Sequence, residues 1–577
     1  MKINDVEKIT GLTSKAIRLY ESKGLITVRR DENGYRNYSD KDVNTLKSIK
    51  LLRSVGASIS DIKLYLFGII SVNELMDKRK AEILNESGQN SEKYRLCERL
   101  SQNNSLDILD DINGFSEGEE TVNKSYGSIS VGIDIGTTTV SAVIYDIDNC
   151  EQVEAFCAPH NSYVYSDFRS EQDVSVIIEK TERLLYHILD SYENIVSIGI
   201  TGQMHGIVYI DREGNAVSNL INWQDKRGDK ILKDGKNACQ MIYDITKESI
   251  STGYGICTHY YNVLSGEVPK NARSFVSIMD YFIMKICNLK NVTVHSSVAA
   301  SFGLFDIRKN EFMKDKLSLL GIENELLPSV TGESIIVGNL RGIPVSIAIG
   351  DNQASFLGSV SENEEGMLIN IGTGSQISAV SEYCCASGDM EIRPLIEGKY
   401  LICASSLCGG FAYSMVEGFF RSYILSMGME NVSQYKVINQ LAKDAYENGE
   451  NGLDIDVSFF GKRSNPDLRG SIKMIDSQNF TPSSLIIGVL KGMCNELYGF
   501  YRLFPQKKKK AVASGGAVKK NPVLKNLIAD TFDMPVVTSM LKEETATGVS
   551  LFSAFVTKKI EYKNGFGKYI KYMRSDL

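Results

Sequence analysis

The chain has 577 residues, of which 43% are hydrophobic and 23% charged, and its formal net charge is −7. This length exceeds what one hydrophobic core supports, so we expect three or four domains. The composition argues against a disordered or collagen-like chain, and the lack of a long apolar stretch or signal-peptide core argues against a membrane protein. The eleven cysteines show no CxxC pair, which predicts reduced thiols and a cytoplasmic location.

Charge is distributed unevenly. Residues 1–70 contain 13 Lys and Arg against 8 Asp and Glu, a net charge of +5, whereas the remainder contains 51 against 63, a net charge of −12. This asymmetry indicates that residues 1–70 alone meet a polyanion. Helical patterns on either side of Gly11 predict a helix-turn-helix, Asn33-Gly34 predicts a hairpin turn, and two further helices are expected from Ser39 and Ser58.

The order of these motifs resembles the MerR family of winged-helix transcription regulators. The resemblance rests on residues 13–20, 23–25, 33–38 and 51–57. It implies binding of double-stranded DNA, with a recognition helix in the major groove and a wing on the flanking backbone. The alternative is a small helical domain with a solvated basic face. The implied DNA-binding residues are Lys15 and Arg18 on the recognition helix, and Arg29, Arg30, Tyr35 and Arg36 in the wing.

Residues 71–109 have a helical pattern and stand where the MerR family has a dimerisation helix, which implies a homodimer. Arg79, Glu86 and Asn90 occupy positions where the seam of such a dimer needs apolar residues. Residues 110–127 are acidic and contain Gly and Ser, which is typical of a linker.

Two glycine–threonine turns of the same kind stand at residues 131–139 and 368–375. Each lies between two short apolar runs, which predicts a β-hairpin whose tip offers backbone N–H groups and hydroxyls. Such tips suit phosphate oxygens, and two facing copies would hold one polyphosphate. The remaining pattern alternates strands with helices, so we expect an α/β body with lobes at 128–357 and 358–577. The repeated opening indicates a duplication.

Two carboxylates follow buried apolar strands. Asp134 precedes Gly136 in the first turn, and a carboxylate there is costly unless it is paired or binds a ligand such as Mg²⁺, directly or through water. Asp351 follows the apolar run 343–350 and would project into a cleft as the base that takes a proton from an alcohol. The alternatives are a turn-capping Asp134 and a helix-capping Asp351.

Polar loops follow two further strands, at residues 201–206 and 222–227. They combine amide, imidazole and carboxylate groups with Trp223, the only tryptophan, and such a mixture binds polyols. A structural role is the alternative for His205. A strand at 511–514 then runs into Gly515-Gly516, where uncrowded backbone suits an adenine ring, although a Gly-Gly turn alone is a weak signal.

The body resembles the FGGY family of carbohydrate kinases along nearly its whole length. The matching motifs are residues 134–138, 203–206, 223–227, 350–354, 371–374, 461–463 and 515–517. The resemblance implies a duplicated ribonuclease-H-like fold of the actin/hexokinase type, ATP and Mg²⁺ as cofactors, and transfer of phosphate to a sugar hydroxyl with Asp351 as base. The implied ATP- and phosphate-binding residues are Asp134 (also the Mg²⁺ ligand), Gly136, Thr137, Thr138, Thr139, Gly372, Thr373, Gly374, Gly410, Gly515, Gly516 and Asn521. The implied substrate-binding residues are Gln203, Met204, His205, Gly206, Trp223, Asp225, Tyr254, Asp351 and Asn352.

Within that family, residues 203–206 resemble the ketose-handling branches, the xylulose and sedoheptulose kinases. Residues 223–225, 253–255 and 350–353 resemble the sedoheptulose-kinase branch more than the xylulose-kinase branch. Ser141, where the family often has a basic residue, and the lack of a carboxylate at 295–301 depart from the family pattern. The alternatives are a xylulose or other sugar kinase, and a regulator whose kinase half acts as a sugar sensor. Because Asp134, Asp351 and both turns are present, we expect catalysis.

Overall fold

The computed structural model describes residues 1–30, 35–86, 92–103, 126–232, 235–385, 388, 390–462, 465 and 467–573. The expected wing turn at Asn33 and Gly34, Asn90, Arg463 and most of the expected linker lie outside the described residues. The chain forms two compact units, one of Met1–Tyr126 with Phe156–Pro159 and Phe420–Lys436, and one of the remainder. Among the described residues, no helix combines the length and apolar character needed to cross a bilayer.

The first unit contains the expected helix-turn-helix. Gly11 ends the first helix in the left-handed region at φ 65°, and Thr13 accepts a hydrogen bond from the Ala16 N–H at the start of the second. Ser39 and Ser58 cap the next two helices, as expected. Its elements are α1 (Ile3–Thr10), α2 (Ser14–Ser22), β1 (Arg29–Arg30), β2 (Arg36–Asn37), α3 (Asp40–Ser54), α4 (Ile59–Leu66), α5 (Val72–Glu86) and α6 (Glu92–Asn103).

The segment after residue 71 forms two helices, α5 and α6, which pack against each other. Arg79, which interrupts the expected dimer seam, is only 9% exposed. Its Nε donates to the Val55 carbonyl oxygen at 3.1 Å, so its charge is used inside this unit. Arg79 is therefore explained by contacts within its own chain, even though it stands at a position where a dimer seam would need an apolar residue.

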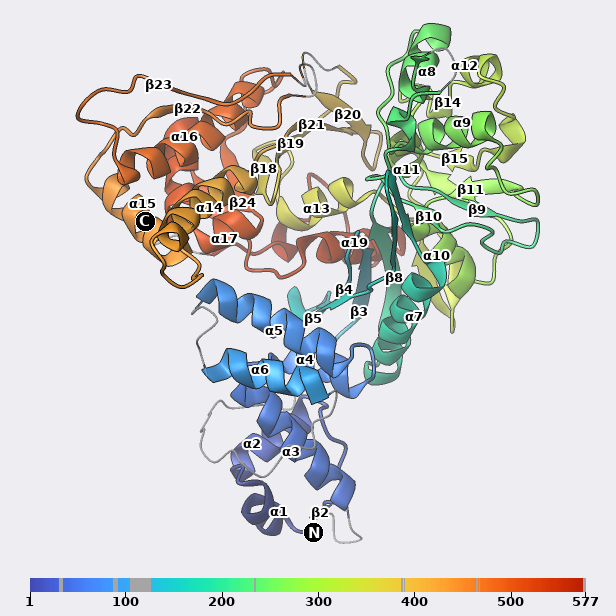
Figure 1. The fold of residues 1–577 in the computed structure, drawn as a ribbon. Coiled ribbons are helices and arrows are strands. Elements are labelled where there is room, and N and C mark those ends of the chain that lie inside the picture. Colours follow the sequence, from blue (N-terminus) through green and yellow to red (C-terminus); the bar gives the residue numbers. More distant parts are fainter. Residues whose placement is uncertain are drawn as a thin grey trace. The chain divides into compact units, whose positions relative to one another are not determined.

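The second unit contains two six-stranded sheets with the same core topology (Figure 1). In each, an antiparallel hairpin (β3/β4, β18/β19) is extended by parallel strands (β8 and β17, β24 and β25), which confirms the expected duplication. The first sheet has the order β16 (Ile336–Leu340), β17 (Ile343–Ser346), β8 (Ile195–Gly202), β3 (Ile129–Ile135), β4 (Thr139–Asp146) and β5 (Glu151–Pro159). The second has the order β20 (Glu391–Pro394), β21 (Tyr400–Ser406), β19 (Ser375–Ser381), β18 (Gly366–Ile371), β24 (Lys510–Ser514) and β25 (Val536–Thr538).

Two helices, α13 (Asp351–Ser359) and α19 (Glu544–Val556), pack against each other in the middle of the second unit (Figure 1). α19 comes from the end of the chain but lies on β3 and β8 of the first sheet. Apolar residues of both sheets and both helices form one core, which includes Tyr145, Phe356, Leu368 and Phe552. The two sheets are thus joined by side-chain packing.

Smaller elements surround this framework. The short strands are β6 (Tyr163–Ser166), β7 (Arg169–Gln172), β9 (Val208–Ile210), β10 (Leu220–Ile221), β11 (Ser274–Val276), β12 (Thr293–His295), β13 (Phe305–Asp306), β14 (Glu311–Phe312), β15 (Ser329–Thr331), β22 (Asp454–Asp456) and β23 (Ser471–Lys473). The helices are α7 (Val174–Ser191), α8 (Ala238–Thr246), α9 (Gly255–Ser265), α10 (Ile278–Ile286), α11 (Ser296–Ala299), α12 (Lys314–Leu319), α14 (Gly410–Ser426), α15 (Tyr435–Glu447), α16 (Pro482–Tyr501), α17 (Gly516–Lys520) and α18 (Pro522–Phe532).

Candidate active site

A pocket of about 170 Å³ lies where the two hairpins, the end of β8 and the start of α13 meet. It brings together six of the residues expected at the site, although they are as far apart in sequence as Asp134 and Asn352. The pocket also contains residues that sequence reasoning did not assign. The lining residues are Asp134, Gly136, Thr137, Gln203, Asp351, Asn352, Ser355, Leu368, Asn370, Gln376, Ser378 and Thr545.

The two carboxylates of this pocket act on each other electrostatically. Burial raises the pKa of Asp134 to about 8, and the negative charges of Asp351 and Glu543 add to the effect. Burial also raises the pKa of Asp351, while Arg393 and a hydrogen bond of 2.8 Å from the Asn352 amide oppose that shift. Asp134 Oδ1 is enclosed and accepts no hydrogen bond from any residue that the structure describes. Such a costly arrangement of like charges is typical of a site that binds a cation.

Asn370 is the most informative of the missed residues. It stands in the second hairpin at the place of Asp134 in the first, because both precede an Ile-Gly-Thr sequence. Asp134 pairs with Thr201 of the neighbouring parallel strand, and Asn370 pairs with Ser514 in the same way. A polar residue in an otherwise apolar strand was the available signal, and comparing the two turns residue by residue would have found it.

The first turn is fixed by bonds to its carbonyl oxygens. The Gly136 N–H donates to the Thr139 carbonyl at 2.9 Å and closes the turn. The Gln203 amide donates to the Gly136 carbonyl at 3.2 Å, and the Gln172 amide donates to the Thr137 carbonyl at 2.8 Å. The carbonyl oxygen of the exposed residue Thr138 accepts a hydrogen bond from the backbone N–H of His160. The turn is therefore held in one conformation before any ligand arrives, which lowers the entropic cost of binding.

The second turn packs against two other glycine-containing segments. The Gly410 N–H, at the start of α14, donates to the Gly372 carbonyl at 2.9 Å, and the Phe411 N–H donates to the Thr373 carbonyl at 3.0 Å. Gly515 has φ 93°, and a β-carbon there would lie 2.4 Å from the Ile371 carbonyl oxygen. The structure thus brings the expected phosphate-binding and adenosine-binding segments side by side. Gly374 belongs to the same turn, and Asn521 caps the adjacent helix α18.

The expected sugar-binding loops lie next to the first turn. His205 has φ 73°, an uncommon conformation for a residue other than glycine, and its ring stacks on Tyr254 with 4.2 Å between centroids. Trp223 is 46% exposed, and its indole N–H donates to the Thr137 hydroxyl at 3.0 Å. One aromatic plane therefore links the sugar loop to the phosphate turn. Met204 is buried against Gly350, and Gly206 packs closely on Ile221.

Asp225 is arranged differently from the other expected sugar ligands, because its side chain is completely buried. It accepts hydrogen bonds from the Ser170 N–H and from the Arg227 backbone and guanidinium, at 2.8–3.1 Å. Arg227 in turn donates to Glu171 at 2.7 Å and to Asn262 at 2.8 Å. In this conformation the Asp225 carboxylate holds the loop together. Sequence reasoning could not find Glu171 or Asn262, because neither stands in a recognisable motif.

The residues present fit a magnesium ion together with phosphate oxygens. Within the described ranges, no group of three or more His, Cys, Asp or Glu side chains forms a complete metal site. Mg²⁺, however, is usually held by one or two carboxylates plus waters and substrate phosphates rather than by a protein cage. Asp134, with its unpaired buried oxygen, and Asp351 would provide those carboxylates.

Comparisons with known proteins agree with this geometry. Residues 129–358 match the N-terminal domain of the FGGY family of carbohydrate kinases, and residues 1–68 match the MerR helix-turn-helix regulatory family. Sedoheptulokinase of Mus musculus is 25% identical over 452 residues, which cover 71% of this chain and 94% of that protein. Xylulose kinase of Staphylococcus xylosus is 24% identical over 451 residues, which cover 74% of this chain and 90% of that protein.

A solved structure, gluconate kinase of Lactobacillus acidophilus, superimposes with a TM-score of 0.66 at 18% identity and covers 78% of this chain and 93% of that one. This likeness shows the duplicated fold. The matched kinases are spanned almost completely, and the additional residues of this chain include the MerR-type segment. Residues 129–358 therefore match the FGGY family of carbohydrate kinases in sequence, and residues 1–68 match the MerR helix-turn-helix family.

Proposed function

We propose that the protein transfers the γ-phosphate of ATP to the terminal hydroxyl of a ketose, with sedoheptulose as the first candidate. The observation that supports this most is that Asp351 and both glycine–threonine hairpins line one pocket. We further propose DNA binding by residues 1–70, dimerisation through 71–109, a linker at 110–127, and kinase lobes at 128–357 and 358–577. Sedoheptulose is favoured over xylulose by the sequences of the polar loops and by the similarity to mouse sedoheptulokinase.

In the proposed reaction, Asp351 accepts a hydrogen bond from the sugar hydroxyl, orients it toward the γ-phosphorus atom and takes its proton as the new O–P bond forms. The bond between the γ-phosphorus and the bridging oxygen of ATP breaks in the same step, and ADP leaves. The backbone N–H groups of the two turns stabilise the phosphate oxygens. Bound Mg²⁺ would neutralise phosphate charge, with Asp134 as its main protein ligand. His205, Tyr254 and Trp223 would hold the sugar, and Asp225 would keep their loop in place through Arg227.

Turnover with a panel of ketoses and polyols, together with the Asp351 variant discussed below, tests this proposal. We expect the highest kcat/KM with sedoheptulose and lower values with D-xylulose and glycerol. A clear preference for xylulose would mean that the proposed substrate is wrong, while the proposed phosphoryl transfer would still hold. Sugar binding without turnover for any substrate would favour the second candidate, a regulator that uses the kinase domain as a sensor.

The affinity for Mg²⁺ should depend on pH. Because the pKa of Asp134 is raised to about 8, a proton competes with the cation below that pH. We expect the apparent dissociation constant to fall about tenfold per pH unit from pH 6 to 8 and to level off above. Mg²⁺ titrations of the nucleotide complex, corrected for protons that the nucleotide binds, measure this. In Asp134→Asn the affinity should be weak and should change less with pH, because only Asp351 remains to titrate, and an unchanged slope would contradict the assignment.

Enlarging Gly516 should weaken ATP binding without affecting folding. A β-carbon at Gly516 would meet no atom within 4 Å, so the first atom of a larger side chain has room there, and the thermal melt checks that Gly516→Val still folds. If adenosine lies on this backbone, the added methyl groups should raise the KM for ATP at least tenfold and leave the KM for sugar unchanged. Steady-state kinetics and a thermal melt measure both effects. Gly499→Val, on a glycine that also has open space, is the matched control and should leave the KM for ATP unchanged.

The MerR-type domain is proposed to bind duplex DNA through its basic residues. Lys15 and Arg18 lie on α2, and Arg29 and Arg30 form β1, paired with β2. We expect Arg29→Ala to weaken binding at all sequences and to reduce the slope of log affinity against log salt by about one. Salt-dependent gel-shift or anisotropy titrations measure this. We also propose that sugar binding changes the affinity for DNA, as sugar-linked control of transcription requires. Identical DNA affinity with and without sugar and ATP would argue against this coupling.

A further inference from the structure

Two cysteine sulfurs face each other beside the sugar-binding loop. Cys239 on α8 and Cys257 on α9 have their Sγ atoms 3.3 Å apart, close enough for one thiol to donate a hydrogen bond to the other. A disulfide needs about 2.05 Å between the sulfurs, so a further approach of roughly 1 Å would allow a covalent bond. Neither residue has a role in the proposed kinase reaction. A metal site is not supported as an alternative, because no third ligand joins the pair among the described residues.

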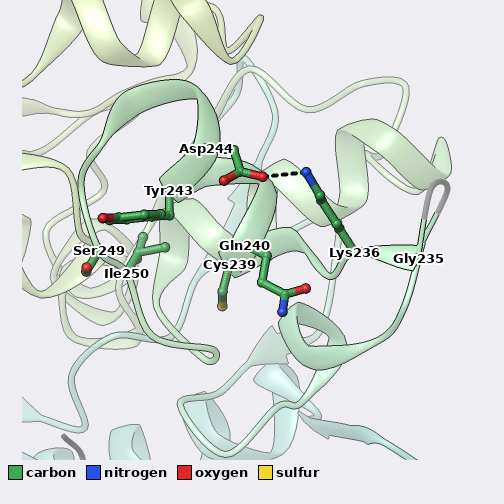
Figure 2. Close-up of a pocket in the computed structure, with 8 residues that line it drawn as sticks. All are labelled: Gly235, Lys236, Cys239, Gln240, Tyr243, Asp244, Ser249 and Ile250. Atoms are coloured by element: carbon green, nitrogen blue, oxygen red, sulfur yellow. Dashed lines mark hydrogen bonds and ion pairs between the residues drawn. The ribbon is translucent and has the colours of Figure 1, made fainter.

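Of the two cysteines, Cys239 is the more accessible to solvent. Cys239 is half-buried and lines an open pocket of about 540 Å³, together with Lys236, Tyr243 and Asp244 (Figure 2). Lys236 and Asp244 form an ion pair of 2.6 Å at its edge. Cys257 is completely buried. An oxidant of small size would therefore meet Cys239 first, and Cys257 would be placed to resolve the product.

The chemistry of the two thiols agrees with this order. A hydrogen bond from Cys257 holds the pKa of Cys239 below its ordinary value, although burial acts in the opposite direction. The same hydrogen bond, followed by burial, raises the pKa of Cys257. A thiolate is the nucleophile in thiol–disulfide exchange, so Cys239 is the sulfur that attacks.

The pair contacts the segments that carry the sugar-binding groups. A β-carbon at Gly228 would lie 2.6 Å from Cys257 Sγ. This sulfur is therefore packed closely against the backbone that directly follows Asp225 and Arg227. Arg227 also donates to Asn262 on α9, one turn beyond Cys257. Tyr254, which stacks on His205, immediately precedes α9. A shift of Cys257 is therefore transmitted to both the Asp225 turn and the Tyr254 ring.

We propose that Cys239 and Cys257 form a reversible disulfide that weakens sugar binding, an inference that rests on the proposed function for its regulatory part. The oxidant is a small disulfide such as oxidised glutathione. The Cys239 thiolate attacks one of its sulfurs, the S–S bond breaks, and one thiolate leaves as a mixed disulfide forms. Cys257 then attacks Cys239 Sγ and expels the second thiolate. The protein loses two electrons and two protons, which reduce the small disulfide to two thiols.

The test uses the full-length protein with Cys384 and Cys385 changed to Ser, so that these two neighbouring thiols do not react. The protein is equilibrated with mixtures of oxidised and reduced glutathione, and its free thiols are then alkylated. After proteolytic digestion, the masses of the peptides are measured by mass spectrometry. We expect a cross-linked peptide pair containing residues 239 and 257, reversed by reduction. In the oxidised protein the KM for sugar should rise at least threefold, with the KM for ATP unchanged.

Cys239→Ser, at a half-buried position, should abolish both effects, and Cys257→Ser should trap glutathione on Cys239 as a mixed disulfide. Glutathione retained on Cys239 of the protein with both cysteines, or no reaction at all, would overturn the proposal. A complete cross-link that leaves the KM for sugar unchanged would overturn its regulatory part. The cross-link is detected by mass, so a failure to phosphorylate any ketose would contradict the proposed function and leave the thiol result standing.

Discussion

Asp351→Asn should lower kcat by about 10²–10⁴-fold, because the amide that replaces the carboxylate cannot accept the proton of the sugar hydroxyl. Asp351 opens α13 and lines the pocket shared by both hairpins. Asparagine has the same shape and can still accept the hydrogen bond from Asn352, so the loop geometry should persist. The KM values for sugar and ATP should therefore change little. Steady-state kinetics, with sugar binding measured by calorimetry, separate the two quantities.

Asp280→Asn is the matched control for this variant. Asp280 is also a buried carboxylate near the start of a helix, where its carboxylate accepts a bond of 2.6 Å from the Ser277 hydroxyl, and burial raises its pKa to about 7. It does not line the site pocket. The control should retain kcat within a few-fold. Equal losses in both variants would mean that removing any buried charge disturbs the protein, and unchanged turnover in Asp351→Asn would mean that the base lies elsewhere.

Local sequence patterns predicted the parts of this protein that depend on neighbouring residues. Gly11, Ser39 and Ser58 set helix ends, and the capping rules place them without tertiary information. The two Gly-Thr turns predicted hairpins and a duplicated sheet, because a turn of this kind between apolar runs has few alternatives. Asp134 was correctly placed at the end of a strand, β3. The strand expected over 343–350 ends at Ser346, and Asp351 instead begins α13, yet the structure brings both carboxylates to one pocket.

Contacts between distant segments could not be predicted in this way. The packing of α19 on the first sheet joins residues about 400 positions apart in the sequence. A run of four lysines such as 507–510 is typical of a solvated turn, yet Lys508 is buried and donates to three carbonyl oxygens, those of Asn363, Glu364 and Val380. Similarly, Asp225 was expected to face the sugar, and its partners Arg227 and Ser170 are known only from the fold. A charged residue's burial depends on partners that composition does not reveal.

Gly548→Ala should lower the free energy of unfolding of the kinase unit by about 3 kcal/mol or more, a large effect for one methyl group. α13 and α19 cross at Gly358 and Gly548. A β-carbon at Gly548 would lie 1.8 Å from the Ala354 carbonyl oxygen, and one at Gly358 would lie 1.9 Å from the Glu544 carbonyl oxygen. These contacts involve backbone, which cannot rotate away. Urea unfolding can be followed by the fluorescence of Trp223, the only tryptophan, which reports on this unit alone.

Gly499→Ala separates this steric effect from the ordinary helix propensity of glycine. Gly499 also lies inside a helix, α16, but a β-carbon there would meet no atom within 4 Å. Alanine should therefore stabilise the helix by about 0.5–1 kcal/mol. Because the crossing of α13 and α19 also sets the position of Asp351, Gly548→Ala should reduce kcat as well as stability, whereas Gly499→Ala should change neither kcat nor KM. Equal stabilities of the two variants would show that the crossing of α13 and α19 accommodates the added methyl group. They would also show that the crossing does not fix the position of Asp351, the proposed base.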